Sequence, residues 1–309
     1  MSDLILHHYT MSPFAEKARL MLGFKGLAWR SVMIPAVMPK PDVVALTGGY
    51  RKTPVLQIGA DVYCDTALIA QVLQSHQPAP SLFPAAAPMA RPLAQWADSV
   101  LFWCAVSWAM QPAGAAAILG TQGTPESMKS FAVDRAAMTS GMRRMSLADG
   151  TVQLQAHLAA LNAQMAQGQA YLLGASPCVA DFSVAHCLWF IRQATPVAHI
   201  LAPHAALSAW LDRVLAFGHA TSTAMDSAEA VAIAHAASSH APTQVAAGLG
   251  LEAGQAITVA ATDYGTDPVA GVLVGLGADE VVLRRDDPRA GTVHVHFPRA
   301  GFQIKKEAA

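Results

Sequence analysis

The stretch HHYTMSPFAEKARLML (residues 7–22) joins the end of a short apolar run to an amphipathic helical pattern through a serine and a proline. Proline is favoured at the first position of a helix, so Pro13 marks a helix start and Ser12 its N-terminal cap. We expect a strand over residues 4–9 and a helix over 13–24, ended by Gly26. The role of the Ser12 hydroxyl at this junction is the first question that the sequence raises.

The segments that follow predict a small α/β domain. AWRSVMI (28–34) suits a second strand, and KTPVLQIGADVYCD (52–65) is typical of a hairpin with a Gly-Ala-Asp turn. DTALIAQVLQSH (65–76) then has helical spacing. A strand, a helix, a strand, a hairpin and a helix in this order indicate an α/β fold. We assign it to residues 1–78.

The middle of the chain predicts an all-helical domain over residues 90–222. Five prolines between positions 78 and 92 indicate an irregular linker before it. The sequence then becomes rich in alanine, leucine, methionine and tryptophan, with Trp96, Val100, Trp103 and Ser107 on one helical stripe. Such spacing is typical of a helical bundle. Residues 224–237 suit one more helix.

In the last part of the chain, apolar residues recur with a different period. Apolar residues alternate in segments such as Ile257/Val259/Ala261, and the turn signals DYGTDP and RDDPRAG separate these segments. Charged residues are also denser after position 279. We therefore predict a small all-β, barrel-like module over residues 245–309, of unknown role, which folds onto the rest of the protein or onto a partner subunit.

Composition excludes some classes of partner. Hydrophobic residues make up 53% of the 309 residues, and charged residues make up 13%, about half of the roughly 25% that is typical. The chain can therefore build a large core, and its low charge indicates apolar surface covered by a second subunit. A net charge of −1 gives no support for binding to nucleic acid or to an anionic membrane.

Other features predict a cytoplasmic protein. The N-terminal residues MSDLILHHYT lack the pattern of a signal peptide, and we find no long apolar run typical of a membrane-spanning helix. The four cysteines are scattered without a C-x-x-C pair, which fits a reducing compartment and disfavours zinc binding by cysteine.

Three dipeptides along the first domain suggest binding of an anionic ligand. Ser12-Pro13 and Asp65-Thr66 both begin helices, where free backbone N–H groups favour anions, and Thr53-Pro54 precedes a strand. A proline there suits either an edge position or a cis peptide bond. Taken singly, each dipeptide has a simpler explanation as a cap or a turn. Taken together, they suit an amino-acid or peptide ligand with a thiolate at Ser12.

This ordered set resembles the glutathione S-transferase family, over about residues 1–220. Ser12-Pro13-Phe14 matches the family's Ser/Cys-Pro-aromatic motif, Thr53-Pro54 its cis-proline motif, and Asp65-Thr66 its acidic-hydroxyl pair, which is usually Glu-Ser. The resemblance implies a thioredoxin-like first domain followed by an all-helical domain. It also implies a homodimer that uses glutathione as co-substrate to detoxify small hydrophobic electrophiles.

The resemblance also implies a set of site residues. Ser12 is then the catalytic residue, with Tyr9 as an alternative, since other members use a tyrosine near the end of the first strand. The expected glutathione-binding residues are Lys40, Lys52, Thr53, Pro54, Asp65 and Thr66. In the second domain, Asp181 matches a buried structural aspartate of the family, while Cys178 stands where a capping serine or threonine is usual.

Two functions follow from these residues. In the first, Ser12 and the N-terminus of its helix stabilise the thiolate of glutathione, which attacks an electrophile; an isomerase or a dehalogenase would use the same thiolate. In the second, the chain is a non-catalytic scaffold of the same fold whose β module contacts a partner. Phe102, Trp103 and Met110 are candidates for the electrophile pocket, although such stripes are more often core.

One histidine pair has a spacing that could suit a metal site. His294 and His296 lie on one face of a predicted strand, but no third ligand can be identified from the sequence. The two histidines are explained more simply as residues on the solvent-exposed face of a half-buried strand. We therefore expect no metal ion in this protein.

Overall fold

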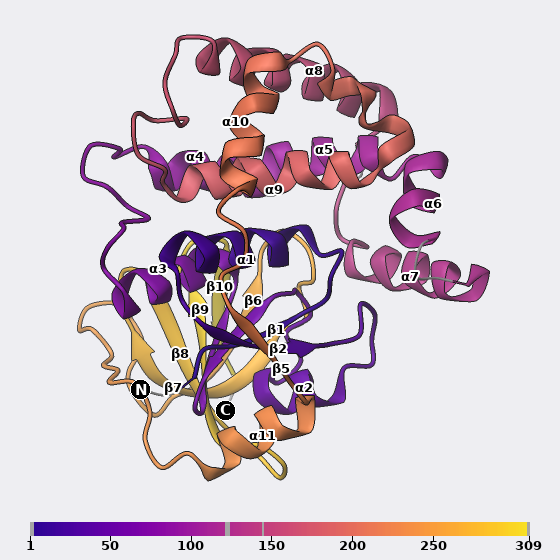
Figure 1. Cartoon of the computed structure of the whole chain (residues 1–309). Coiled ribbons are helices and arrows are strands. Elements are labelled where there is room, and N and C mark those ends of the chain that lie inside the picture. The colour runs from indigo at the N-terminus through magenta and orange to yellow at the C-terminus, as the bar shows by residue number, and fades with distance from the viewer. Residues whose placement is uncertain (1–2, 121–123, 144, 308–309) are drawn as a thin grey trace.

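The structure is a computed structural model that describes residues 3–120, 124–143 and 145–307 (Figure 1). Its strands are β1 (Ile5–His8), β2 (Trp29–Met33), β3 (Val55–Ile58), β4 (Asp61–Cys64), β5 (Ser222–Met225), β6 (Ala256–Ala261), β7 (Val269–Leu276), β8 (Glu280–Asp287), β9 (Gly291–Pro298) and β10 (Phe302–Lys306). Across the described residues these ten strands form one sheet in the order β10-β6-β7-β8-β9-β4-β3-β1-β2-β5.

The helices of the N-terminal part are α1 (Pro13–Lys25), α2 (Pro41–Thr47) and α3 (Thr66–His76). The helical part holds α4 (Ala90–Trp96), the π-helix η1 (Ala97–Leu101), α5 (Phe102–Ala109), α6 (Pro112–Gly120), α7 (Pro125–Met138), α8 (Leu147–Met165), α9 (Val179–Gln193), the 3-10 helix η2 (Thr195–Leu201) and α10 (Ala205–Leu215). Helix α11 (Ser227–Ala236) lies beneath the sheet in Figure 1.

The local predictions for the first domain are confirmed, apart from one missed helix. Ser12 caps α1, Pro13 occupies its first turn, and Gly26 ends it with φ = 63°, a left-handed conformation that favours glycine. Helix α2 was missed because it has only seven residues and lacks a side-chain cap. Its pattern was too short to show a helical period.

The two faces of the sheet carry different cores. Leu4, just before β1, and Leu6 within it point to the core that includes α1, α3 and the helical bundle, whereas Ile5 points to the opposite core. The second core contains α2, α11 and most apolar residues of the C-terminal strands. Figure 1 shows α1 and α3 between the sheet and the bundle, with α2 and α11 on the other side.

The C-terminal β module is present, and it folds onto the N-terminal domain. Strand β9 pairs in parallel with β4, with Val62 opposite Val295, so the module continues the first domain's sheet. In the described residues β10 pairs with β6 alone, so the five strands of the predicted barrel-like module stay open between β9 and β10. A barrel would satisfy its own edges, whereas here the free edge of β4 provides the partner for β9.

The limits proposed for the three domains stay a prediction. Strand β5 returns from the helical part to pair with β2, and α11 packs in the same core as the C-terminal strands. The first and third proposed domains therefore share one sheet and one core. The outermost residues of these two domains, 1–2 and 308–309, lie outside the described residues.

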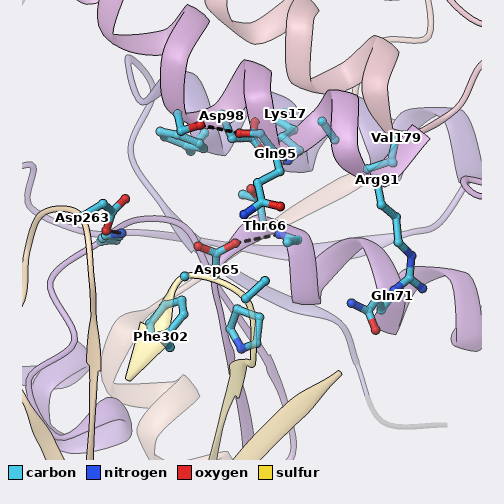
Figure 2. Close-up of a pocket in the computed structure, with 18 of the residues that line it drawn as sticks. Lys17, Asp65, Thr66, Gln71, Arg91, Gln95, Asp98, Val179, Asp263 and Phe302 are labelled. Carbon is cyan, nitrogen blue, oxygen red and sulfur yellow. Dashed lines mark hydrogen bonds and ion pairs between the residues drawn. The ribbon is translucent and has the colours of Figure 1, made fainter. Parts of the chain in front are cut away.

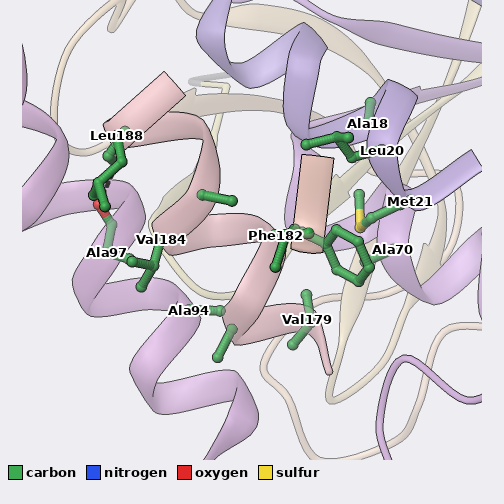
Figure 3. Close-up of a cluster of buried hydrophobic side chains, with 14 of the residues drawn as sticks. Ala18, Leu20, Met21, Ala70, Ala94, Ala97, Val179, Phe182, Val184 and Leu188 are labelled. Atoms are coloured by element: carbon green, nitrogen blue, oxygen red, sulfur yellow. Dashed lines mark hydrogen bonds between the residues drawn. The ribbon is translucent and has the colours of Figure 1, made fainter. Parts of the chain in front are cut away.

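The bundle packs on the first domain through small and aromatic side chains. Figure 3 shows Phe182 and Val179 of α9 between Ala18 and Met21 of α1 and Ala94 of α4. Asp181 is buried at the start of α9, where its carboxylate accepts hydrogen bonds from the backbone N–H groups of Leu172 and Cys178, each at 2.9 Å. It also accepts one from the Trp210 indole at 2.9 Å. Its role is structural, and the Cys178 thiol donates to it at 3.4 Å.

Within residues 3–120, 124–143 and 145–307, no single helix is long and apolar enough to cross a membrane. The segments Ala90–Ala109 and Pro112–Gly120 together have sufficient length and apolar composition, but a bend of 93° separates them.

The shared core predicts that the C-terminal strands stabilise the whole protein. Phe297 of β9 is 1% exposed, and its ring lies 5.8 Å from that of Tyr50, centroid to centroid. Phe297→Ala should therefore lower the free energy of unfolding by about 3–5 kcal/mol. Urea denaturation measures this loss, and Val133→Ala, at a side chain 62% exposed on α7, is the control. A loss under about 1 kcal/mol, or separate unfolding of residues 245–309, would contradict a shared core.

Candidate functional site

A cavity of about 350 Å³ lies where the N-terminal domain, the bundle and the C-terminal strands meet (Figure 2). Its volume is within the range of small-molecule sites. The residues that line it include Phe14, Lys17, Lys52, Thr53, Pro54, Asp65, Thr66, Gln71, Arg91, Gln95, Asp98, Ser99, Thr262, Asp263, Tyr264 and Phe302. Five of the six residues that the sequence predicted to bind glutathione, all except Lys40, thus line one cavity.

The Asp65-Thr66 pair sits at the start of α3 in a strained backbone. Asp65 has φ = 75° and ψ = 139°, unusual for a residue other than glycine, and its Oδ1 accepts a hydrogen bond from the Ala67 N–H at 2.8 Å. Strain of this kind is concentrated at functional sites. Burial raises the pKa of Asp65, although the positive charge of nearby Lys52 lowers this pKa to a smaller extent. The carboxyl group of Asp65 thus faces the cavity from a fixed position (Figure 2).

Thr53 and Pro54 form another part of the cavity wall, just before β3. Their peptide bond is cis, as the family resemblance implied. The hydroxyl of Thr53 accepts a hydrogen bond from Lys40 Nζ at 3.1 Å. Burial lowers the pKa of Lys40 to about 8, and neighbouring Arg135 adds to this effect. Lys40 is therefore held beside Thr53, although it does not itself line the cavity.

A largely buried charge cluster in the cavity wall was missed in the sequence. The Nζ of Lys17 donates to Thr66 Oγ1 at 3.0 Å and to Asp98 Oδ2 at 2.5 Å, and the Lys17 side chain is only 1% exposed. Asp98 also contacts His186 Nε2 at 3.0 Å. Burial alone would raise the pKa of Asp98, but Lys17 and His186 hold it below its usual value. The cluster joins α1 to the π-helix η1, a type of turn that often marks functional sites.

Ser12 lies at the helix start beside the cavity but does not line it. It is 2% exposed, and its Oγ accepts a hydrogen bond from the Ala15 N–H at 3.2 Å. Among the described residues we find no acceptor for its hydroxyl proton. The rival hydroxyl, Tyr9, accepts a hydrogen bond from Arg135 Nη2 at 3.1 Å. Ser12 therefore caps α1, and its hydroxyl O–H can still donate one hydrogen bond.

The C-terminal strands supply a wall that we did not expect. The carboxylate of Asp263 pairs with Lys52 Nζ at 2.6 Å, and the Tyr264 ring lies 4.2 Å from the same atom. Tyr264 also packs edge-on against Trp103, with ring centroids 5.1 Å apart. The charge of Lys52 is therefore already paired within the protein. In the sequence these residues stood out only as part of the turn signal DYGTDP.

The apolar candidates from the bundle lie elsewhere. Phe102, Trp103 and Met110 are not among the described residues that line the cavity. Phe102 is buried in the core, Trp103 lies behind Tyr264, and Met110 packs against a separate small cluster. The more frequent explanation of such stripes, as core, holds for all three.

Comparisons with known proteins identify two domains of one family in this chain. The pattern of the domain described as "Glutathione S-transferase, N-terminal domain" matches residues 6–81, and that of "Glutathione S-transferase, C-terminal domain" matches residues 144–213. Among curated proteins no significant match was found.

Solved structures extend the comparison to the whole chain. A GST-like protein from Pseudomonas syringae is 45% identical, with a TM-score of 0.81, over 99% of this chain and 100% of its own. A glutathione transferase from Phanerochaete chrysosporium is 21% identical with a TM-score of 0.54, over 70% of this chain and 98% of its own. A rice glutathione S-transferase, solved in complex with glutathione, is 19% identical with a TM-score of 0.50, over 69% and 86%.

The first of these matches includes the C-terminal strands, because it covers almost all of the chain. The other two are too distant in sequence to show more than a common fold. With both domain patterns in the expected order and a relative of 45% identity along its full length, the chain belongs to the glutathione S-transferase family.

Proposed function

We propose that this protein is a glutathione transferase that binds glutathione in the cavity described above and activates its thiol at Ser12. One observation carries the proposal. Thr53-Pro54 and Asp65-Thr66, which are separated in sequence, line the same cavity above the N-terminus of α3 and next to the start of α1. Family membership gives the general activity, and this cavity offers the polar groups that a small peptide requires.

The tripeptide would be held by three kinds of contact. The backbone of Thr53, beside the cis bond, suits the peptide group of glutathione. Thr66 and the N-terminus of α3 suit its α-carboxylate, and the carboxylate of Asp65 suits its ammonium group. Lys40, 3.1 Å from the Thr53 hydroxyl, is the better candidate for the second carboxylate. Lys52 already pairs with Asp263.

Activation of the thiol would follow from the geometry of the α1 N-terminus. A free thiol has a pKa of about 8.5, so it is mostly protonated at neutral pH. The Ser12 hydroxyl would donate a hydrogen bond to the sulfur, while the helix dipole favours its negative charge. A shift of two pKa units corresponds to about 2.7 kcal/mol in favour of the thiolate.

The chemical step would be a simple nucleophilic attack. The thiolate sulfur forms a bond to an electrophilic atom of the substrate, and the displaced electron pair leaves with the leaving group or stays on the adduct. Ser12 forms no covalent bond and keeps its own proton through the cycle. A small hydrophobic electrophile suits the aromatic side of the cavity, where Phe14, Tyr264 and Phe302 lie.

A second candidate function is supported by a specific observation. Ser12 is 2% exposed and lies outside the cavity wall, and Lys52 is neutralised by Asp263. Such a site would suit a scaffold of the transferase fold that binds glutathione, or a partner, without activating a thiol.

The proposal of a glutathione transferase has three further parts that rest on the family. They are a cytoplasmic location, a role in detoxification and a homodimer.

The first test separates these two functions. With Ser12→Ala, glutathione should still bind, but the thiolate absorbance of the complex near neutral pH should be lost and kcat/KM should fall by about 100-fold. Ser12→Thr, which keeps the hydroxyl, should restore most of both, and Tyr9→Phe should leave both near the wild-type level. Because the cap itself stabilises by about 1 kcal/mol, unfolding of each variant is measured in parallel.

Absence of a thiolate in the wild-type complex would favour the scaffold. Loss of the thiolate in Tyr9→Phe, with its retention in Ser12→Ala, would instead assign activation to Tyr9.

The second test uses the pKa of Lys40, which burial and Arg135 lower to about 8. A ligand carboxylate binds the charged lysine more tightly, so affinity for S-methylglutathione should be constant below pH 8 and fall by up to tenfold per unit above it. Calorimetry over this range measures the effect. Lys40→Arg, which stays charged, should remove this dependence while leaving that of the ligand's own ammonium group. Identical profiles for the two proteins would exclude Lys40 from the site.

The third test concerns the C-terminal wall. Tyr264→Ala removes a ring that contacts both Lys52 and Trp103, so KM for an aromatic electrophile should rise on the order of tenfold. The pKa of the bound thiol should not change, because Ser12 is untouched. Tyr264→Phe retains the ring and should resemble the wild type. An unchanged KM in Tyr264→Ala would show that the electrophile does not contact this wall.

A further inference from the structure

A second cluster of polar side chains lies at the other end of β4 from Asp65. It contains Asp61, the first residue of β4, together with His240 and His294. One potential ligand atom of each residue lies within 4.8 Å of those of the other two. The Nδ1 atoms of His240 and His294 both face Asp61 Oδ1. The two nitrogen atoms are 3.8 and 3.9 Å from Asp61 Oδ1, respectively.

The fold brings these three residues together from three separate segments. Parallel pairing of β4 with β9 sets Asp61 directly opposite His294. The segment after α11 then crosses this face of the sheet, because the Ala241 N–H donates to Asp61 Oδ2 at 2.8 Å. This contact places the His240 ring over that of His294, with centroids 3.8 Å apart and planes within 15°.

Two atoms of the cluster have unused hydrogen-bonding capacity. The Nδ1 atoms of His240 and His294 are buried, and neither has a hydrogen-bond partner within the described part of the chain. A buried polar atom without a partner costs free energy, and in native proteins such an atom usually has a bound water or ion. Both nitrogens lie near the same carboxylate oxygen, which points to one shared ligand that is positively charged or a strong electron-pair acceptor.

A neighbouring histidine keeps the carboxylate in place. His296 Nε2 lies 3.1 Å from Asp61 Oδ1, and its Nδ1 lies 3.1 Å from Glu280 Oε2. The side chain of His296 is 1% exposed, so this arrangement is well shielded from water. Such outer contacts orient the ligands of metal sites.

We propose that Asp61, His240 and His294 bind one divalent transition-metal ion, for which zinc is the best chemical match. Two imidazole nitrogens and one carboxylate oxygen are a common zinc ligand set, with a fourth position left for water. Bonds of about 2.0–2.2 Å place tetrahedral ligands about 3.3–3.6 Å apart. The observed separations of 3.8 and 3.9 Å would therefore need to close by a few tenths of an ångström. Because the two rings are stacked and a nitrogen lone pair lies in its ring plane, one imidazole would also need to turn so that both Nδ1 atoms point at the ion.

The proposed site differs from the pair of His294 and His296 that the sequence suggested. His294 and His296 share a face, but His296 acts on Asp61, and the second imidazole comes from His240. A bound ion would tie the segment after α11 to β4 and β9 and so fasten the C-terminal strands to the first domain. The ion lies away from the cavity wall residues and would stabilise the fold without entering the transferase reaction.

The test is metal binding by the full-length protein. After removal of metals with a chelator, the protein should take up one zinc ion per chain, measured by mass spectrometry of the dialysed sample. At free zinc about 100 times the Kd, Tm should rise by about 5 °C. His240→Ala and His294→Ala should each lose the stoichiometric zinc and the shift in Tm. His235→Ala, at an exposed histidine of α11, is the matched control and should keep both.

A second variant and a stability measurement distinguish loss of a metal ligand from misfolding. His296→Gln leaves the three ligands intact, so it should keep the stoichiometry but weaken zinc affinity by about 10- to 100-fold. His240 lies outside a regular element, and metal-free His240→Ala should have the Tm of the metal-free wild type.

Two results would overturn the proposal: failure of the wild type to retain zinc, or retention of zinc with wild-type affinity by folded His240→Ala, which would indicate adventitious binding. Neither result depends on glutathione or on transferase activity.

Discussion

The parallel pairing of β4 with β9 is the contact on which most of this structure depends. Strand β4 would otherwise be the open edge of the N-terminal sheet, with unpaired N–H and C=O groups exposed to solvent. The pairing covers that edge and joins the apolar face of the C-terminal strands to the core beneath the first domain. It also determines what lies at the two ends of β4. At one end the loops of the module close the cavity beside Asp65, and at the other His294 stands next to Asp61.

The buried pair of Lys17 and Asp98 has a similar role between the first domain and the bundle. Taking two charges out of water is costly, and the attraction between them offsets this only when further hydrogen bonds satisfy both groups. Thr66 and His186 provide these bonds. Because Thr66 also faces the cavity, the position of the bundle and the shape of the proposed glutathione site are coupled. Any movement of η1 would disturb the start of α3.

Much of the first domain and of its candidate site could be predicted from short motifs. Ser12 as a cap, the turn at Gly26 and the Asp65 cap depend on backbone groups only a few residues away, so the sequence displays them directly. The cis bond before Pro54 was implied by the family resemblance. The missed parts have a common cause. Lys17, Asp98 and Asp263 form hydrogen bonds with partners between 49 and 211 residues away, and Tyr264 packs against Trp103 of the helical part. No local pattern indicates which of these residues will meet.

By itself, then, the sequence determined most helices and strands of the first domain, its helix caps and the polar residues of the candidate site, since these follow from local hydrogen bonding and the period of apolar residues. It also determined that residues 245–309 form strands. Only the tertiary structure decided that these strands extend the first sheet and do not close on themselves, because that choice depends on which edge is free and which faces are apolar across the whole molecule. The same choice placed Tyr264 in the cavity wall and His240 beside His294, and so gave the family's fold a wall and a candidate metal site that its motifs do not contain.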